Sequence, residues 1–484
     1  MTPPRGDEGA APLPPSTAPA SATSRAAARA LRVFGHVEPH ELPLLGALAA
    51  SGWLALAGHY ALKTAREPLV QATGGMIAKG WATALQALLL AALVPLYAWL
   101  CRRLDRARLV AAALAASATA LVGFATLLPT AAPWVGVAFY VFSGIHGLLA
   151  VALVWSVASE LLTTAQGHRL LPLVALGAGC GALCGSWLAA HRFEGGAGIP
   201  ALLALSALFV VGQLLLGLWL LRRCAARSRS PARRLVAPET TIGFGLLRHS
   251  ATVRWLATAV LLLNVVNTTG ELVLAQMAGA AADQSYAALA ASQPGLDRTA
   301  HVRAFLGGFY AQTHFAVNAV TLLLQAFVAS RLLQRAGVGR VLGWLPLVSV
   351  GTWSLAALGL GLYAVRAAKV LENATDYSLG TSARAAVLLP TGAAERWSGR
   401  QQVDTFFVRA GDLLAAGLVL VAVQAGGWGA RELAAVNVLL AVTALGVLHA
   451  LGREHERRVR TERSAPAALP AAVDALRSAA TSHH

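Results

Sequence analysis

Three charged residues lie together at the end of a long apolar run, in the stretch HYALKTAREPLV. Lys63 and Glu67 are one helical turn apart and share a helix face, with Arg66 beside them. A charge within lipid costs roughly 2.5 to 3.5 kcal/mol on insertion scales, so such residues usually face a wet cavity, a partner charge or a substrate. The alternative is the membrane edge, because the run before them is almost of spanning length and Pro68 weakens the helix that follows.

Charges recur in other apolar runs. Glu271 stands in NTTGELVL, where Asn264 and Asn267 add polar side chains to one face. An isolated carboxylate in lipid is more typical of a functional group than of a structural one. Glu271 could pair with Lys63, bind a proton, or do both. Glu160 ends a further apolar run.

A stripe of charges of both signs is expected later in the chain. Arg366, Lys369, Glu372 and Asp376 are spaced three or four residues apart, so they share one helix face. Opposite charges can neutralise each other in lipid, and a structural stripe paired with the following helix is one interpretation. The functional interpretation is a line of groups that capture and release an anion as their partners exchange.

Small residues and missing motifs limit the chemistry further. Gly177, Gly181 and Gly185 form a small face at four-residue spacing, which lets another helix approach closely. His59 and His146 are interpreted as core histidines, with a role in a proton relay as the alternative. The sequence has no phosphate-loop pattern, metal-ligand spacing or nucleophile–base arrangement, so we predict no cofactor, no metal and no enzymatic activity.

The elements that carry these residues are membrane helices. The chain has 484 residues, of which 56% are hydrophobic and 13% charged, and a mean hydropathy of +0.60. A soluble domain carries about 25% charged residues, so lipid is the expected solvent. The net charge of +17 comes from arginines in short loops between apolar runs, which indicates membrane orientation and not binding to nucleic acid.

Apolar runs of about 20 residues predict twelve spanning helices. Gly359 and Gly361 alone separate the ninth from the tenth. Arginine-rich loops on one side place both termini in the cytoplasm, with Lys79 in a sparse outside loop. The predicted spans are 42–62, 82–100, 109–128, 134–160, 170–189, 199–221, 253–277, 304–328, 341–358, 359–378, 403–423 and 431–451.

Two six-helix halves around a basic central loop predict an all-α, polytopic membrane protein of the major facilitator type. Repeats of this kind form one substrate cavity at their interface near the membrane midplane. We expect a monomer in contact with lipid. The predicted parts are a disordered cytoplasmic tail 1–40, a first half 41–221, a basic linker 222–250, a second half 251–452 and a cytoplasmic tail 453–484.

Several stretches resemble the ATP/ADP translocase family of plastids and intracellular bacteria, and most closely its branch in free-living bacteria. The similarity extends over most of residues 40–455. It implies a transporter of the bacterial inner membrane that exchanges nucleotides and needs intramembrane lysines and glutamates. The stretches are LKTAREPLV, WSVASELL, GHRLLPLVALGAG, ENATDYSLGTSARAAVLLPT and VDTFFVRAGDLLAAGLV.

The resemblance implies roles for particular residues. Lys63 matches the family lysine of an L-K-D motif, Glu271 is similar to the glutamate of the seventh helix, and Glu160 lies near the polar motif of the fourth. The chain departs from the family in the tenth helix. Where the family has K-Y-S-L-F-D-P-x-K-E, the first lysine is replaced by Asp376 and the second by Arg384.

The residues and the resemblance together support a secondary transporter that exchanges nucleotides or related phosphorylated anions by alternating access. Lys63, Arg66 and Arg384 would hold phosphate in it. The alternative is a proton-coupled transporter of another solute, with Glu271 or Asp376 as the proton carrier. A non-transporting membrane scaffold is a third hypothesis, and the retained charges argue against it.

Overall fold

A computed structural model describes residues 37–130, 132–194, 198–227, 245–391, 395 and 399–464. Nearly all of the predicted N-terminal tail, most of the linker and the last part of the C-terminal tail lie outside the described residues.

The first helix, α2 (Leu42–Arg103), contains two membrane spans, Leu42–Ala72 and Gly74–Tyr97. They are joined by a sharp break at two glycines, and Gly75 has a φ of +59°, in the left-handed region that favours glycine. The expectation that the helix weakens after Pro68 is wrong, because a proline removes only one bond of the helical ladder. The first span is therefore longer than its apolar run.

Four more long helices complete the first half: α3 (Arg106–Leu127) with the turn η1 (Leu128–Thr130), α4 (Pro133–Leu161), α5 (Thr164–Glu194) and α6 (Gly198–Arg227). Helices α4, α5 and α6 pack against α2, and α3 packs against α6. The face of small residues on α5 lies directly against α2. A Cβ atom at Gly177 would meet Ala49, and one at Gly181 would meet the carbonyl of Trp53. Gly185 lies in the same way against Ala57.

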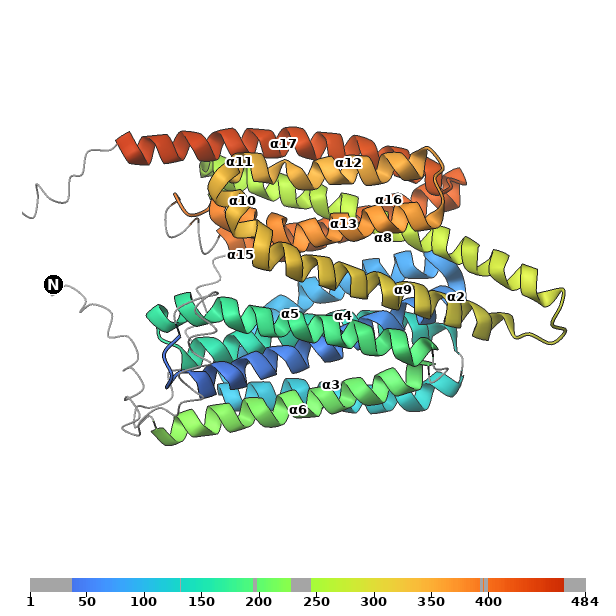
Figure 1. Cartoon of the computed structure of the whole chain (residues 1–484), viewed down its shortest axis with the longest axis horizontal. Coiled ribbons are helices and arrows are strands. Elements are labelled where there is room, and N and C mark those ends of the chain that lie inside the picture. Colours follow the sequence, from blue (N-terminus) through green and yellow to red (C-terminus); the bar gives the residue numbers. More distant parts are fainter. Residues whose placement is uncertain are drawn as a thin grey trace, which may run out of the picture.

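The second half begins with a short helix, α7 (Gly245–His249), and a very long one, α8 (Ala251–Ala290). The loop predicted after residue 277 is instead a continuation of α8, which turns back into α9 (Arg298–Leu323) as a projecting hairpin (Figure 1). A π-helical turn, η2 (Leu324–Val328), joins α9 to α10 (Ala329–Ala336).

The rest of the second half alternates short and long elements. As predicted, the ninth and tenth spans separate at Gly359, which has a φ of +81°. The elements are α11 (Val338–Leu342), α12 (Trp344–Ala357), α13 (Leu362–Thr375), the π-turn η3 (Asp376–Gly380), α14 (Thr381–Val387), α15 (Arg400–Gln402), the π-turn η5 (Val403–Phe407), α16 (Val408–Gly426) and α17 (Ala430–Ser464).

Within the described residues, ten helices are long and apolar enough to cross a membrane. The two other predicted spans correspond to α11–α12 and α13–α14, which pack against α17 and α9 in the same bundle. These spans are interrupted by glycine and by charged residues, which explains why length and composition do not select them.

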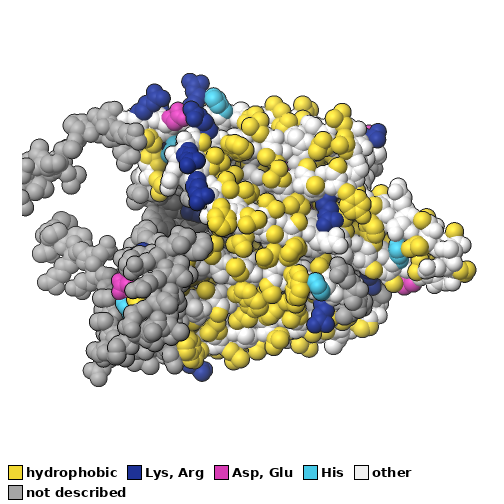
Figure 2. Space-filling model, viewed as in Figure 1, with side chains coloured by type: hydrophobic (Ala, Val, Ile, Leu, Met, Phe, Trp, Pro, Cys, Tyr) yellow, Lys and Arg dark blue, Asp and Glu magenta, His cyan; other side chains and the backbone are white. Residues whose placement is uncertain are grey.

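The bundle has two ends, which we call the tail face and the turn face. The tail face is where α2 begins and α17 ends, and the turn face is where α2 breaks at Gly74 and α8 turns into α9 (Figure 1). Apolar side chains cover the body between them, while a group of Lys and Arg side chains gathers at the tail face (Figure 2). This is the surface of a protein that sits in a bilayer with a basic end.

Candidate functional site

Lys79 is the centre of the site, and its predicted position in an outside loop is wrong. Its side chain is 2% exposed, and its Nζ lies 2.9 Å from Oε2 of Glu67 and 3.9 Å from Oε2 of Glu271. It also donates a hydrogen bond of 3.2 Å to the backbone carbonyl of Glu271. The break at Gly74 returns the chain into the bundle at once, so that Lys79 faces the helix that precedes it. Lys79 thereby connects the first half to the second.

Glu67 holds several partners on the first span of α2. Besides Lys79, its carboxylate accepts from Nε of Arg66 at 3.2 Å and from Nε2 of Gln71 at 3.3 Å. Gln71 also donates to the hydroxyl of Tyr310 on α9 at 2.9 Å. The Arg66 guanidinium lies over the ring of Tyr140, 4.2 Å from its centroid. Glu67 and Arg66 are therefore buried partners and do not lie at the membrane edge.

Glu271 faces the same region from α8. Its side chain is 31% exposed, and Oε1 accepts a hydrogen bond of 3.2 Å from Asn373 on α13. Charges from Lys369, Lys79 and Lys63 all act on this carboxylate. The pairing of Glu271 with Lys63 that the sequence suggested is not what the structure shows, because the ion pair is made by Lys79.

Lys369 and Glu372 form a second buried pair, 2.9 Å apart, at the centre of the second half. Lys369 also donates to Asn267 of α8 at 2.9 Å. Glu372 accepts from Ser349 at 2.5 Å and from the indole of Trp353 at 3.2 Å, both on α12. Both members of this pair thus make further hydrogen bonds, as a buried ion pair requires.

The predicted stripe on the tenth span does not act as one line. Arg366 bonds to Gln312 on α9 at 3.3 Å, and Asp376 pairs with Arg384 at 2.7 Å on its own helix. Outside its own span, the stripe makes hydrogen bonds to α8, α9 and α12, and among the described residues none of its hydrogen bonds runs to the eleventh span that one interpretation expected. Asp376 is the first residue of the π-turn η3, and its partner Arg384 lies beyond that turn. Glu160 is exposed at the last turn of α4, outside this group.

Seven charged residues from the two halves therefore form one group, which we call the central cluster. Lys63 is its one member with neither an ion pair nor a hydrogen bond within the described part of the chain. Its Nζ lies over the ring of Tyr60, 5.4 Å from the centroid, and the residue is partly exposed. The central cluster consists of Lys63, Arg66, Glu67, Lys79, Glu271, Lys369 and Glu372.

Contacts between the halves close the space on the turn-face side of Lys63. Thr64 lies 3.2 Å from Nδ1 of His314, and Gln71 bonds to Tyr310, each joining α2 to α9. Nearer the turn face, the ring of Phe193 packs where a Cβ at Gly307 would lie. Together with the bridge made by Lys79, these contacts form a plug between the cluster and the turn face.

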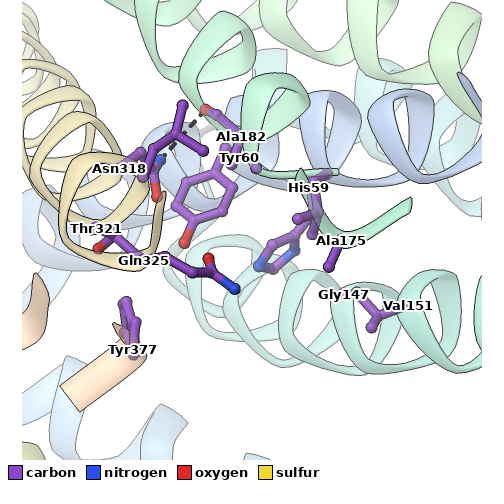
Figure 3. A pocket seen from close by; sticks show the side chains of 13 residues that line it. His59, Tyr60, Gly147, Val151, Ala175, Ala182, Asn318, Thr321, Gln325 and Tyr377 are labelled. Carbon is purple, nitrogen blue, oxygen red and sulfur yellow. Dashed lines mark hydrogen bonds between the residues drawn. The ribbon is translucent and has the colours of Figure 1, made fainter. Parts of the chain in front are cut away.

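A cavity of about 290 Å³ lies on the tail-face side of this plug (Figure 3). Helices α2, α4 and α5 form its wall in the first half, and α9, η2 and η3 form its wall in the second. Tyr60 belongs to this wall and also carries the Lys63 ammonium over its ring. Its polar lining residues are His59, Tyr60, Asn318, Thr321, Gln325 and Tyr377.

Sequence reasoning did not predict the role of Lys79 in the site, the residues of the cavity wall, or Ser349 and Trp353 as the hydrogen-bond partners of Glu372. One signal could have found Lys79: the chain has only three lysines, at positions 63, 79 and 369, and all three meet around Glu271. Tyr60 and Tyr377 carry no comparable signal, because an aromatic residue in an apolar run is usually packing.

No protein-family model matches the chain, and no curated protein is similar to it in sequence, so the ATP/ADP translocase resemblance stays a prediction. Solved transporter structures are similar in fold. A mutant form of the nucleoside transporter NupG is 13% identical with a TM-score of 0.61, covering 84% of this chain and 99% of that one.

Two further structures show the same similarity. A bacterial homologue of the iron transporter ferroportin, in its inward-facing state, is 14% identical with a TM-score of 0.61, covering 85% of this chain and 99% of that one. The human organic anion transporter MFSD10 (TETRAN) is 14% identical with a TM-score of 0.55, and the similarity covers 85% of this chain and 100% of that one. The chain is an all-α polytopic membrane protein with the fold of the major facilitator transporters, as predicted.

Proposed function

We propose that this protein is a secondary transporter that exchanges organic anions, nucleotides or related phosphorylated compounds, by alternating access. The observation that carries the proposal is Lys63, an intramembrane ammonium without a carboxylate partner among the described residues. A lone charge between two halves is expensive unless a ligand of opposite charge visits it. Lys63 lies beside the cavity at the interface where this fold binds its substrate.

The geometry supports one half of an alternating cycle. The plug closes the turn face and the cavity lies on the tail-face side, so the structure fits a state that is closed at one end. The basic tail face is assigned to the cytoplasm by its arginines. On this assignment the substrate enters the cavity from the cytoplasm, and the bridge made by Lys79 must break for release on the other side.

Exchange follows from the charge of the empty site. Without a ligand, Lys63 leaves the interface with an uncompensated positive charge, and rearranging the halves would carry that charge through a medium of low dielectric constant. A bound anion neutralises it. The loaded protein therefore reorients more easily than the empty one, which is the condition for obligate exchange.

A proton-coupled transporter of another solute is the second candidate. Glu271 is the most exposed carboxylate of the central cluster, at 31% against 2% for Glu67 and 4% for Glu372. Its contact to Lys79, at 3.9 Å, is also the longest ion pair there. A carboxylate so placed is the one that could take up a proton and release Lys79.

Uptake into proteoliposomes tests both candidates. Vesicles that hold the purified protein are preloaded with unlabelled AMP, ADP or ATP, or left empty, and labelled nucleotide is added outside. Uptake into preloaded vesicles alone supports exchange, while uptake into empty vesicles that depends on a pH gradient supports proton coupling. If folded protein takes up none of these anions under either condition, the anion proposal is wrong.

A further inference from the structure

The cavity beside Lys63 contains polar groups that the protein itself leaves unused. Nδ1 of His59 and Oγ1 of Thr321 are buried without a hydrogen-bond partner. Gln325 lines the same cavity and is exposed, and within the described residues its amide makes no hydrogen bond. In Figure 3 this amide points into the space between Tyr60 and His59. Buried polar groups such as those of His59 and Thr321 are nearly always paired, so a ligand with polar edges is expected to complete them.

Two aromatic rings border the same space, one from each half. Tyr60 comes from α2 and Tyr377 from η3, and both rings line the cavity (Figure 3). Neither hydroxyl donates or accepts a hydrogen bond within the described residues. Aromatic faces of this kind stack on flat rings, and they tolerate any ring that has a π-face.

The cavity wall in the second half is built at two π-helical turns. Gln325 lies in η2 on the eighth span, and Tyr377 lies in η3 on the tenth. Each π-turn inserts a residue into the helix and re-aims the side chains around it, and such turns occur frequently at functional sites. The two π-turns also contact one another. Gln325 and Tyr377 are thereby presented to the cavity together.

The charge of the central cluster limits the ligand. Its four cations face three carboxylates, and the surplus positive charge is that of Lys63. The neighbouring pair Asp376–Arg384 adds no net charge. One ammonium can neutralise one anionic group, whereas a polyphosphate would bring several charges into a region that already holds Glu67 and Glu271.

We propose that the substrate is a flat heteroaromatic ring that carries a single anionic group, a phosphomonoester or a carboxylate, with the ring against Tyr60 and the anionic group at Lys63. This inference rests on the proposed function and names its substrate class. The ring's polar edges would meet Gln325 and Thr321. A cavity of about 290 Å³ lies just below the usual range for ligand pockets, which begins at about 300 Å³, and so it suits a small ligand of this kind.

Binding to the purified full-length protein tests the proposal, read out by isothermal calorimetry. The probes are AMP, ATP, orotate, adenosine and inorganic phosphate. AMP or orotate is expected to bind at least about tenfold more tightly than ATP, phosphate and adenosine. AMP and orotate distinguish a phosphomonoester from a carboxylate as the anionic group.

Variants separate the ring from the charge. Tyr60→Leu is expected to weaken the binding of AMP or orotate by about tenfold or more and to leave the binding of phosphate unchanged. Tyr60→Phe keeps the ring and should keep most of the affinity for AMP or orotate. Tyr363→Leu is the matched control, because this tyrosine is 66% exposed at the start of α13. Lys63→Gln should remove the advantage of AMP over adenosine.

The outcomes also separate this inference from the proposed function. ATP binding more tightly than both AMP and orotate, or phosphate binding as well as they do, overturns the substrate class while leaving anion exchange in place. Equal binding by Tyr60→Leu and the native protein overturns the stacking role. Failure of every anion to bind or exchange would remove the proposed function itself.

Discussion

The Lys79 ammonium donates to the backbone carbonyl of Glu271 at 3.2 Å and lies 3.9 Å from its carboxylate, so that a side chain of the second span contacts the seventh. This contact crosses from one half of the bundle to the other. Since Lys79 is also bound to Glu67, the same ammonium links the polar face of the first span to the second half. Reorientation of the halves has to separate Lys79 from Glu271.

The buried pair of Lys79 and Glu67 should be strongly coupled. Lys79→Met leaves the Glu67 carboxylate without its closest cation, and breaking a buried pair in this way costs about 3 to 5 kcal/mol. The double variant with Glu67→Gln should lose less than the sum of the two single variants, with a coupling energy of about 1 to 3 kcal/mol. Thermal unfolding of the four proteins in detergent measures this, and strictly additive losses would contradict the bridge.

Lys63 and Lys369 should respond oppositely to the same substitution. Lys63→Gln removes a charge that has no partner, so transport should be abolished while the melting temperature is unchanged or higher. Lys369→Gln strands Glu372, which is 4% exposed, and should lower the free energy of unfolding by about 3 to 5 kcal/mol. Nucleotide exchange and thermal unfolding of both variants are the measurements; normal exchange by Lys63→Gln would exclude Lys63 from the site.

Close packing of α5 on α2 should be sensitive to a single methyl group. Gly181→Ala places its Cβ against the Trp53 carbonyl, and overpacking of this kind costs about 1 to 3 kcal/mol. Gly123→Ala on α3 is the control, because a Cβ there meets nothing within 4 Å and helix propensity predicts a gain of up to about 1 kcal/mol. Equal melting temperatures for the two variants would show that the helices can separate at no cost.

A pH dependence is expected at the tail face, where Glu41 holds the start of α2 to α5. Burial works to raise the pKa of Glu41, but hydrogen bonds from Arg169, from the Glu38 backbone and from Gln166 outweigh it and bring the pKa below its usual 4.5. Because the folded pKa is lowered, the stabilising effect is fully present above the unfolded value and is lost as the pH falls through the folded one. The ion pair to Arg169 is 2.8 Å long.

Melting temperatures of the native protein and of Glu41→Gln, followed from pH 7 to pH 3, measure this effect. The difference between the two should be constant from pH 7 to about pH 5.5 and shrink below about pH 4.5. A difference that persists unchanged at pH 3 would mean that Glu41 acts through packing and not through its charge.

The sequence predicted the architecture well because lipid imposes a strong pattern. Apolar runs and their arginine-rich joints are sufficient for the helix order, and Gly359 is enough to divide the ninth span from the tenth. The site was harder to predict. Helical spacing put Lys63, Arg66 and Glu67 on the correct helix, but which charges pair is decided by contacts between helices far apart in the chain.

Two local features explain the wrong expectations. Gly75 bends α2 so tightly that no loop separates its spans, which puts Lys79 inside the bundle and not outside it. Asp376 begins the π-turn η3 and pairs with Arg384 beyond that turn, so it takes no part in the ion pair of Lys369 with Glu372 although the spacing suggests one face. Neither feature changes hydropathy, and so neither was visible in the apolar pattern.

The break at Gly74 and Gly75 also fixes how the second span of α2 is rotated about its own axis relative to the first span. Because no loop is available to absorb a change in length, the number of residues after Gly75 fixes the angle at which Lys79 leaves its helix. One residue inserted there would rotate Lys79 by about 100° around the helix axis and turn the ammonium away from Glu67. Insertions and deletions in this segment are therefore far less tolerable than substitutions, although the segment lies between two spans where length usually varies freely.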